Sequence, residues 1–196
     1  LVGSLPSPQV FWASSPVLPG ETVLLGTTSR AVQVQIGQRT DTAAAWSWQD
    51  ATALGITDNG LAAEVPANWS PGAYAVRVRQ DADASGANWS EPFTVNAPEP
   101  WFLFGDAGST ASPGGSVRVV GNNLNYNAAA ILPSLEMTPT SGGGTLKLQA
   151  ARASLVNRWH AEFQLPASLS PGDYDVKFSN GVAVAKPCTF IDDQMP

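Results

Sequence analysis

The chain has 196 residues, a formal net charge of −6 and a pI of about 4.6. Its basic residues are few and scattered, which argues against a groove for DNA or RNA and against a polybasic membrane contact. No run of about 18 apolar residues occurs, so we expect no membrane span. Because the chain begins at Leu1 with no signal peptide, we expect a mature form or an excised fragment.

Short alternating runs bounded by turn residues predict β-strands throughout, because 16 prolines and 18 glycines interrupt every longer stretch. In the first half we expect strands at residues 9–12, 22–27, 31–36, 44–49, 60–64, 72–80 and 91–96. In the second half we expect them at residues 101–105, 116–121, 130–133, 145–149, 159–164, 172–179 and 183–191. Seven strands per half is the count of a constant-type immunoglobulin-like sandwich.

The two halves repeat each other, which predicts two domains. Ser-Pro-Gly-x-Tyr occurs at residues 70–74 and again at 170–174, and residues 18–23 are answered by residues 112–117. We therefore predict an all-β fold of two immunoglobulin-like β-sandwiches in tandem, with domains 1–97 and 98–196. A tyrosine after such a turn is typical of a tyrosine corner, so Tyr74 and Tyr174 are expected to be structural.

Groups for catalysis are scarce. His160 is the only histidine, so the chain offers no histidine pair for a metal. No nucleophile elbow precedes a helix, and the Gly-rich residues 141–144 read as a hairpin loop. We expect that this chain is not an enzyme as it stands.

One polar stretch, residues 81–91, resembles a calcium loop. Oxygen-bearing side chains alternate from Asp81 and Asp83, and a glycine stands at the sixth position. The bidentate acid of an EF-hand belongs at the twelfth position, but Glu91 comes one residue early. The alternatives are a calcium site with Asp81, Asp83 and Glu91 as ligands, or a polar hairpin between the last two strands.

Tryptophan is frequent, with seven residues. Trp12 and Trp101 correspond across the halves and are expected in the core or at an interface, and Trp159 is expected in the core. The second half has no equivalent of the Trp46 and Trp48 pair, and core symmetry does not require Trp69 or Trp89 either. Because indole rings stack on pyranose faces, Trp46, Trp48, Trp69 and Trp89 are candidate carbohydrate-binding residues, with core packing as the alternative.

The second half carries a family resemblance. Residues 101–108, Trp-Phe-Leu-Phe-Gly-Asp-Ala-Gly, and residues 112–124, Ser-Pro-Gly-Gly-Ser-Val-Arg-Val-Val-Gly-Asn-Asn-Leu, resemble a pattern found ahead of pectate-lyase-like parallel β-helix domains in secreted bacterial proteins. Their Pro-Gly-Gly-x-Val-x-Val part also resembles IPT/TIG immunoglobulin-like domains. The resemblance covers about residues 100–185, and the first half shares it only through the internal repeat.

This resemblance implies a non-catalytic accessory region of a secreted or cell-surface bacterial polysaccharide-processing protein. No catalytic residue carries over. One expected function is carbohydrate binding that targets the parent enzyme to its polysaccharide. The alternatives are a structural spacer or cap that packs against a downstream β-helix domain, and a cell-surface adhesin module. Exposed tryptophans favour binding, whereas buried tryptophans with an unpartnered apolar patch favour the spacer or cap.

Overall fold

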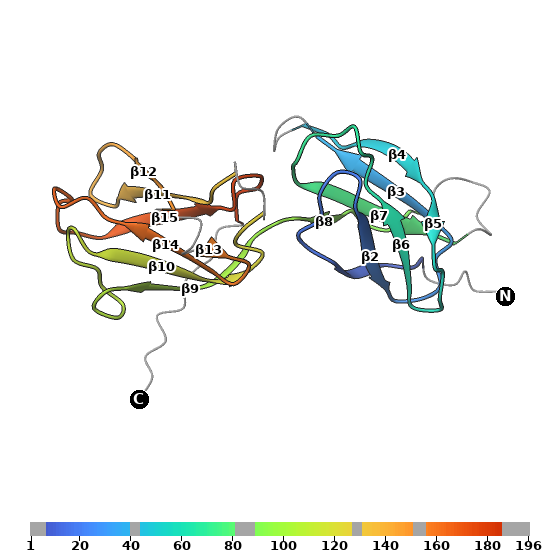
Figure 1. Cartoon of the computed structure of the whole chain (residues 1–196), viewed down its shortest axis with the longest axis horizontal. Helices are drawn as coiled ribbons and strands as arrows, with labels where there is room; N and C mark the ends of the chain where they lie inside the picture. The colour runs from blue at the N-terminus through green and yellow to red at the C-terminus, as the bar shows by residue number, and fades with distance from the viewer. Residues whose placement is uncertain (1–6, 40–43, 81–88, 127–130, 151–155, 186–196) are drawn as a thin grey trace. The chain divides into compact units, whose positions relative to one another are not determined.

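The structure, a computed structural model, describes residues 7–39, 44–80, 89–126, 131–150 and 156–185. Within these ranges all regular secondary structure is β-strand. The chain divides into two compact units, residues 1–96 and 97–196, and each is an immunoglobulin-like β-sandwich (Figure 1). A search of the described residues finds no helix with the length and hydropathy of a membrane span.

The first unit has two four-stranded antiparallel sheets, with the orders β1-β2-β6-β5 and β4-β3-β7-β8. Its core contains Val23 and Leu25 from the first sheet, and Ile36 and Val76 from the second. The strands are β1 (Val10–Ala13), β2 (Thr22–Thr27), β3 (Gln33–Gln38), β4 (Ser47–Ala51), β5 (Ala53–Leu54), β6 (Gly60–Glu64), β7 (Tyr74–Arg79) and β8 (Phe93–Val95).

The second unit repeats this arrangement. Its sheets have the orders β13-β14-β10-β9 and β12-β11-β15, and its core lies between them, with Val119 and Phe163 on one side and Leu135 and Phe178 on the other. The strands are β9 (Glu99–Gly105), β10 (Ser116–Asn122), β11 (Ser134–Pro139), β12 (Leu146–Gln149), β13 (Val156–Asn157), β14 (His160–Gln164) and β15 (Tyr174–Ser179).

Alternation of side chains explains which face of each strand is buried. In β7, Tyr74, Val76 and Val78 are buried, whereas Arg77 and Arg79 lie on the opposite, partly exposed face. The predicted faces of this strand are confirmed, and its two arginines are thereby placed on the outer surface of the sheet.

Several details differ from the sequence predictions. The strands predicted at 31–36, 44–49 and 91–96 are observed at residues 33–38, 47–51 and 93–95, and β13 is not predicted. The described residues of the first unit form eight strands, whereas the spacing predicts seven. The additional strand is β5, which has only two residues and is too short to show an alternation of apolar and polar residues. The strand predicted at residues 130–133 is wrong: residues 131–133 are irregular and the strand begins at Ser134. Of the strand predicted at 183–191, residues 186–191 lie outside the described part, and Val184 forms an isolated bridge with Ser179.

Both predicted tyrosine corners are present. The Tyr74 hydroxyl donates a hydrogen bond to the Ser70 carbonyl at 2.9 Å, and the Tyr174 hydroxyl donates one to the Ser170 carbonyl at 2.6 Å. Each bond joins the strand back to the Ser-Pro-Gly turn that precedes it. The corners differ in burial, because Tyr74 is buried whereas Tyr174 is only half-buried.

We expect Tyr74→Phe to lower the free energy of unfolding of the first unit by about 1 kcal/mol, the usual net contribution of one hydrogen bond. Tyr174→Phe is the matched control, and its effect should be smaller because water can replace the lost hydroxyl there. Urea unfolding followed by tryptophan fluorescence measures both. If the two variants lost the same free energy of unfolding, burial would not determine how much the tyrosine hydrogen bond contributes to stability.

Candidate functional site

A row of aromatic and basic side chains follows the outer face of the sheet β4-β3-β7-β8. Neighbouring members contact each other as four cation–π pairs, with 4.2–5.0 Å from guanidinium carbon to ring centroid, and one ring pair with centroids 6.4 Å apart. We call this row the Trp–Arg ladder. In order of contact its members are Arg79, Trp89, Arg77, Trp48, Trp46 and Arg39.

Strand register positions the centre of the ladder. Trp48 of β4 pairs with Gly37 of β3, and a Cβ atom at position 37 would lie 3.0 Å from the Trp48 Cε3 atom. The glycine therefore leaves the space in which the indole lies. Gln35, two residues earlier, pairs with Arg77 of β7, so Arg77 approaches the Trp48 ring from the next strand.

Amide side chains fix the arginines from the sheet side. Arg77 donates from Nε and Nη2 to Gln35 Oε1 at 2.8 and 2.5 Å, and Gln35 Nε2 donates to Asp50 Oδ1 at 2.8 Å. Arg79 donates from Nε to Gln33 Oε1. Burial lowers the pKa of the Arg77 guanidinium, Arg79 lowers it further and Asp50 raises it, but an arginine starts so high that it stays charged.

The four tryptophans predicted to bind carbohydrate do not form one site. Trp46, Trp48 and Trp89 are half-buried in the ladder, each with a guanidinium over its ring. Trp69 lies in the core of the first unit, with 7% of its surface exposed and its ring centroid 5.5 Å from that of Tyr74. A buried ring cannot stack on a sugar, so Trp69 is excluded from the candidate site.

The predicted calcium site is only partly within the described residues. Asp81 and Asp83 lie outside them, and Glu91 is exposed. Among the described residues no group of three or more metal-ligating side chains occurs. The assignment of calcium to Asp81, Asp83 and Glu91 therefore stays a prediction.

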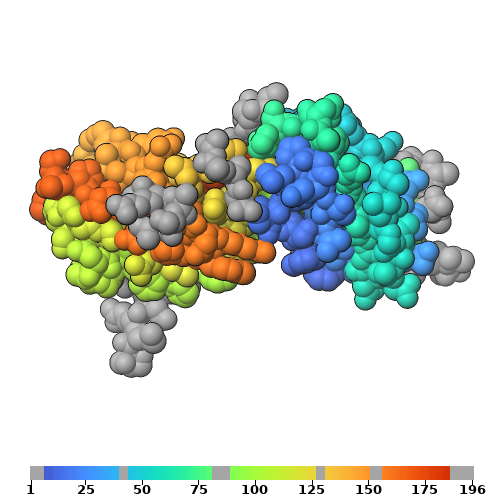
Figure 2. Space-filling model, viewed as in Figure 1, coloured from blue at the N-terminus to red at the C-terminus, as the bar shows by residue number. Residues whose placement is uncertain are grey.

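The second unit presents an aromatic pair that the sequence patterns do not predict. Trp101 and Trp159 are 49% and 51% exposed, and their ring centroids lie 6.2 Å apart with planes tilted by 38°. We call this pair the Trp101–Trp159 platform. The segment that carries β9 and β10, yellow-green in Figure 2, forms part of the surface of this unit.

The expectation that Trp159 lies in the core is wrong, and Trp101, expected in the core or at an interface, is not in the core either; each ring is exposed for a local reason. The strand register changes within β9, because Phe102 pairs with Val120 whereas Pro100 pairs with the next residue, Gly121. Trp101, which lies between them, is therefore the extra residue of a β-bulge. A bulge re-aims a side chain. Trp159 belongs to the turn between β13 and β14, where alternation no longer applies. Trp12 is likewise exposed beside a register shift in β1.

Polar groups border the Trp101–Trp159 platform. The Arg158 guanidinium carbon lies 5.0 Å from the centroid of the Trp159 ring. Arg158 Nε donates to Asn122 Oδ1 at 3.2 Å, and Asn122 Nδ2 donates to Glu99 Oε2 at 3.4 Å. A cation, an amide and a carboxylate thus follow one another beside two exposed rings.

Two further aromatic residues lie on the outer face of the same sheet. Phe102 and Phe104 are both exposed, with ring centroids 5.9 Å apart. The residue between them, Leu103, packs on the core. This strip of β9 is apolar, but a charged pair lies next to it, because Phe104 pairs with Arg118, which donates from Nη2 to Glu162 Oε2 at 3.3 Å.

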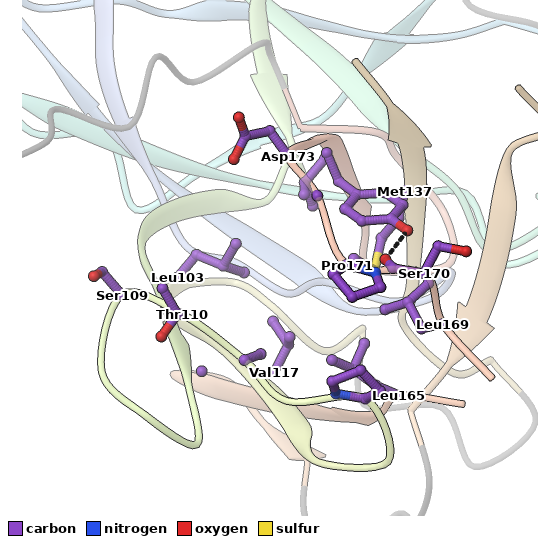
Figure 3. Close-up of a pocket in the computed structure, with 16 residues that line it drawn as sticks. Leu103, Ser109, Thr110, Val117, Met137, Leu165, Leu169, Ser170, Pro171 and Asp173 are labelled. Carbon is purple, nitrogen blue, oxygen red and sulfur yellow. Dashed lines mark hydrogen bonds between the residues drawn. The ribbon is translucent and has the colours of Figure 1, made fainter. Parts of the chain in front are cut away.

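A pocket of about 470 Å³ opens in the second unit (Figure 3). Its lining is mostly apolar and includes Leu103, Met137, Leu169 and Tyr174. Leu169 occupies the position that Trp69 has in the first unit, where the larger ring fills the core.

Catalytic groups do not converge in this pocket. Asp173 is the one ionisable acid or base along its lining besides the Tyr174 phenol, and Asp173 is exposed. His160 lies on β14, with Nε2 3.9 Å from Glu162 Oε2 and no nucleophile between them. Neither place brings together, among the described residues, a nucleophile with a base and the group that orients it.

Comparison with known proteins adds little to this geometry. No family model matches the chain, and no curated protein matches it either. A solved Bacteroides ovatus structure, the mixed-linkage glucan utilization locus SGBP-B in complex with a mixed-linkage heptasaccharide, is 20% identical with a TM-score of 0.36. That match covers 91% of this chain and 40% of the other.

A second solved structure, the FN1–FN3 domains of chicken CNTN1, is 11% identical with a TM-score of 0.32. It covers 92% of this chain and 62% of the other. The chain thus spans less than two thirds of either structure. At such identities and TM-scores these likenesses carry no argument about function, which must come from the surfaces themselves.

Proposed function

We propose that this chain is a non-catalytic carbohydrate-binding region that holds its parent protein on a polysaccharide. The observation that carries the proposal is the Trp101–Trp159 platform, two half-exposed indole rings with their centroids 6.2 Å apart. Soluble proteins rarely expose large neighbouring rings without a partner. Trp101 lies on the edge strand β9, and Trp159 lies in the tight turn between β13 and β14. Rings held by a sheet in this way suit a surface that binds without rearranging.

Stacking supplies the apolar part of such binding. The C–H face of a pyranose is flat and apolar, and an indole ring gives it a large contact area at small entropic cost. The planes of the two indole rings are tilted by 38°, so the rings do not form one flat surface. That shape suits two sugar residues of a twisted chain better than one flat ring system.

Hydrogen bonds supply the specificity. Glu99 and Arg158 are exposed and Asn122 is half-exposed. Their known mutual hydrogen bonds leave further lone pairs and N–H groups available for sugar hydroxyls. A carboxylate, an amide and a guanidinium beside aromatic rings form the mixture of groups that fixes the orientation of a polar ligand.

The setting of the parent protein is part of the same proposal. The family resemblance of residues 101–124 supports a secreted or cell-surface bacterial protein that processes polysaccharide, with a pectate-lyase-like β-helix domain downstream. The absence of converging catalytic groups among the described residues supports an accessory role for this region.

Affinity electrophoresis through gels containing pectin, xylan, β-glucan or alginate tests the proposal. We expect at least one of these polysaccharides to bind the platform and retard the chain, and Trp101→Ala or Trp159→Ala to weaken binding to that polysaccharide at least about tenfold, as truncation of a central aromatic contact does. Trp12→Ala is the matched control, because Trp12 has the same exposure on the other unit. Unretarded migration in every gel would contradict the proposal.

The exposed Phe102 and Phe104 favour a second candidate, a structural spacer or cap. An exposed apolar strip suits packing against another protein domain, here the downstream β-helix. Phe102→Ser with Phe104→Ser distinguishes the two functions. If the strip covers that domain, this double variant loses docking to the separately produced β-helix domain and keeps any glycan binding.

A further inference from the structure

The Trp–Arg ladder gathers most of the positive charge of the first unit on one surface. Residues 1–96 contain four basic residues, Arg30, Arg39, Arg77 and Arg79, and the last three belong to the ladder. The chain as a whole has a net charge of −6. This face is therefore a local cationic row on an acidic protein.

Aromatic rings and amides, not carboxylates, hold the central arginines. Arg77 lies 4.2 Å from the Trp48 centroid and 5.0 Å from the Trp89 centroid, and its hydrogen bonds go to Gln35. Among the ion pairs between described residues, none includes Arg77 or Arg79, whereas Arg30 pairs with Asp58 at 3.8 Å. Neither Arg77 nor Arg79 is thus in an ion pair with another described residue, and the nearby Asp50, whose charge raises the pKa of Arg77, accepts a hydrogen bond from Gln35.

The row is also preorganised. A guanidinium held against indole rings and by a glutamine amide has already lost most of its rotamer freedom, so binding costs little further entropy. Arg77 and Arg79 are two residues apart on one face of β7, which puts their backbones about 7 Å apart. Successive charges at this spacing suit a polymer with regularly repeated anions better than a single small anion.

We propose that the Trp–Arg ladder binds an acidic polysaccharide through the carboxylates of its uronic acid residues. The guanidinium groups donate N–H bonds to these carboxylates in the planar geometry that both groups favour. The outward edges of the indole rings between the arginines contact the apolar faces of the sugar rings. This site is on a different unit from the Trp101–Trp159 platform and does not depend on it.

The same geometry disfavours nucleic acid. Binding to single strands relies on bases that stack on open aromatic faces, and in the ladder a guanidinium lies over each of the three tryptophans. Carboxylates of a uronate chain need only the outward edges of the guanidinium groups.

The test compares one polymer in two charge states. Isothermal titration of the whole chain with polygalacturonate should show saturable binding that weakens as sodium chloride is raised, because salt screens exposed charges. Fully methyl-esterified polygalacturonate has the same sugar backbone without the charge, and we expect no binding to it. Equal affinity for both forms would overturn the proposal.

Protein variants locate the site. Arg79→Gln should weaken polygalacturonate binding at least about tenfold, whereas Arg30→Gln, which removes a cation of the same unit outside the ladder, should leave it unchanged. Circular dichroism of each variant checks the fold. Trp101→Ala should not change binding to polygalacturonate, so failure of this proposal and failure of the proposed function give different results.

Two polyanions that are not polysaccharides complete the test. Polyglutamate and single-stranded DNA should bind at least about tenfold more weakly than polygalacturonate, because neither offers sugar faces to the indole rings. If polyglutamate bound as tightly as polygalacturonate, the ladder would be a surface that binds anions in general. If DNA bound more tightly than polygalacturonate, the ladder would be a nucleic-acid-binding site. Either result contradicts the proposal.

Discussion

Trp69→Ala is expected to lower the free energy of unfolding of the first unit by about 3–5 kcal/mol, the range for truncation of a large buried aromatic ring. Trp69 is 7% exposed and packs against Tyr74 in the core. Differential scanning calorimetry of the whole chain measures the effect as an early transition of one unit. A loss of this size is a large part of the stability of a small domain.

The internal repeat provides matched variants at the same position. Trp69→Leu copies Leu169 of the second unit and should destabilise the first unit less than Trp69→Ala does. Leu169→Trp copies the first unit and should fill a small part of the 470 Å³ pocket, with a gain of about 0.5–2 kcal/mol, as other cavity-filling changes give. If Trp69→Ala abolished glycan binding and left stability unchanged, Trp69 would be a surface contact and its assignment to the core would be wrong.

Gly121→Ala is expected to cause the next largest loss of stability, and it should also weaken glycan binding. A Cβ atom at position 121 would lie 2.2 Å from the Glu99 carbonyl oxygen and 2.7 Å from the Pro100 Cα. These are backbone atoms, which cannot rotate away. The Gly121 N–H also donates to the Trp159 carbonyl at 3.0 Å, so a shift of Gly121 moves the backbone at both tryptophans of the platform.

We expect Gly121→Ala to cost about 3 kcal/mol, towards the upper end of the range for overpacking, and to weaken glycan binding. Gly144→Ala is the control, because a Cβ atom there would have no neighbour within 4 Å. Urea unfolding and affinity electrophoresis measure the two effects. Stability and binding equal to those of the wild type would show that the β9 bulge does not position the platform.

Much of the fold could be predicted because it depends on local patterns. The runs at 22–27 and 60–64 became strands with the same bounds, since their alternation of buried and exposed residues is uninterrupted. Tyr74 and Tyr174 follow a Ser-Pro-Gly turn in both units and form the predicted hydrogen bonds. These features need no knowledge of which strand lies beside which.

The surfaces could not be predicted in the same way, because they depend on register. Alternation in β9 would bury Trp101, but the shift between Val120 and Gly121 adds one residue and turns the ring outward. Trp69 lies in a turn, where no periodicity indicates burial. The ladder joins Trp48 to Arg77 only because their strands both flank β3, and no spacing along the chain contains that information.

The most direct measurement of the central claim is a titration of the seven tryptophan indole N–H signals by two-dimensional ¹H–¹⁵N NMR with the polysaccharide that retards the chain. Single Trp→Phe variants assign the signals. We predict saturable shifts of Trp101 and Trp159, with the signal of buried Trp69 unchanged. A ligand that binds without moving either platform signal would contradict carbohydrate binding by this surface.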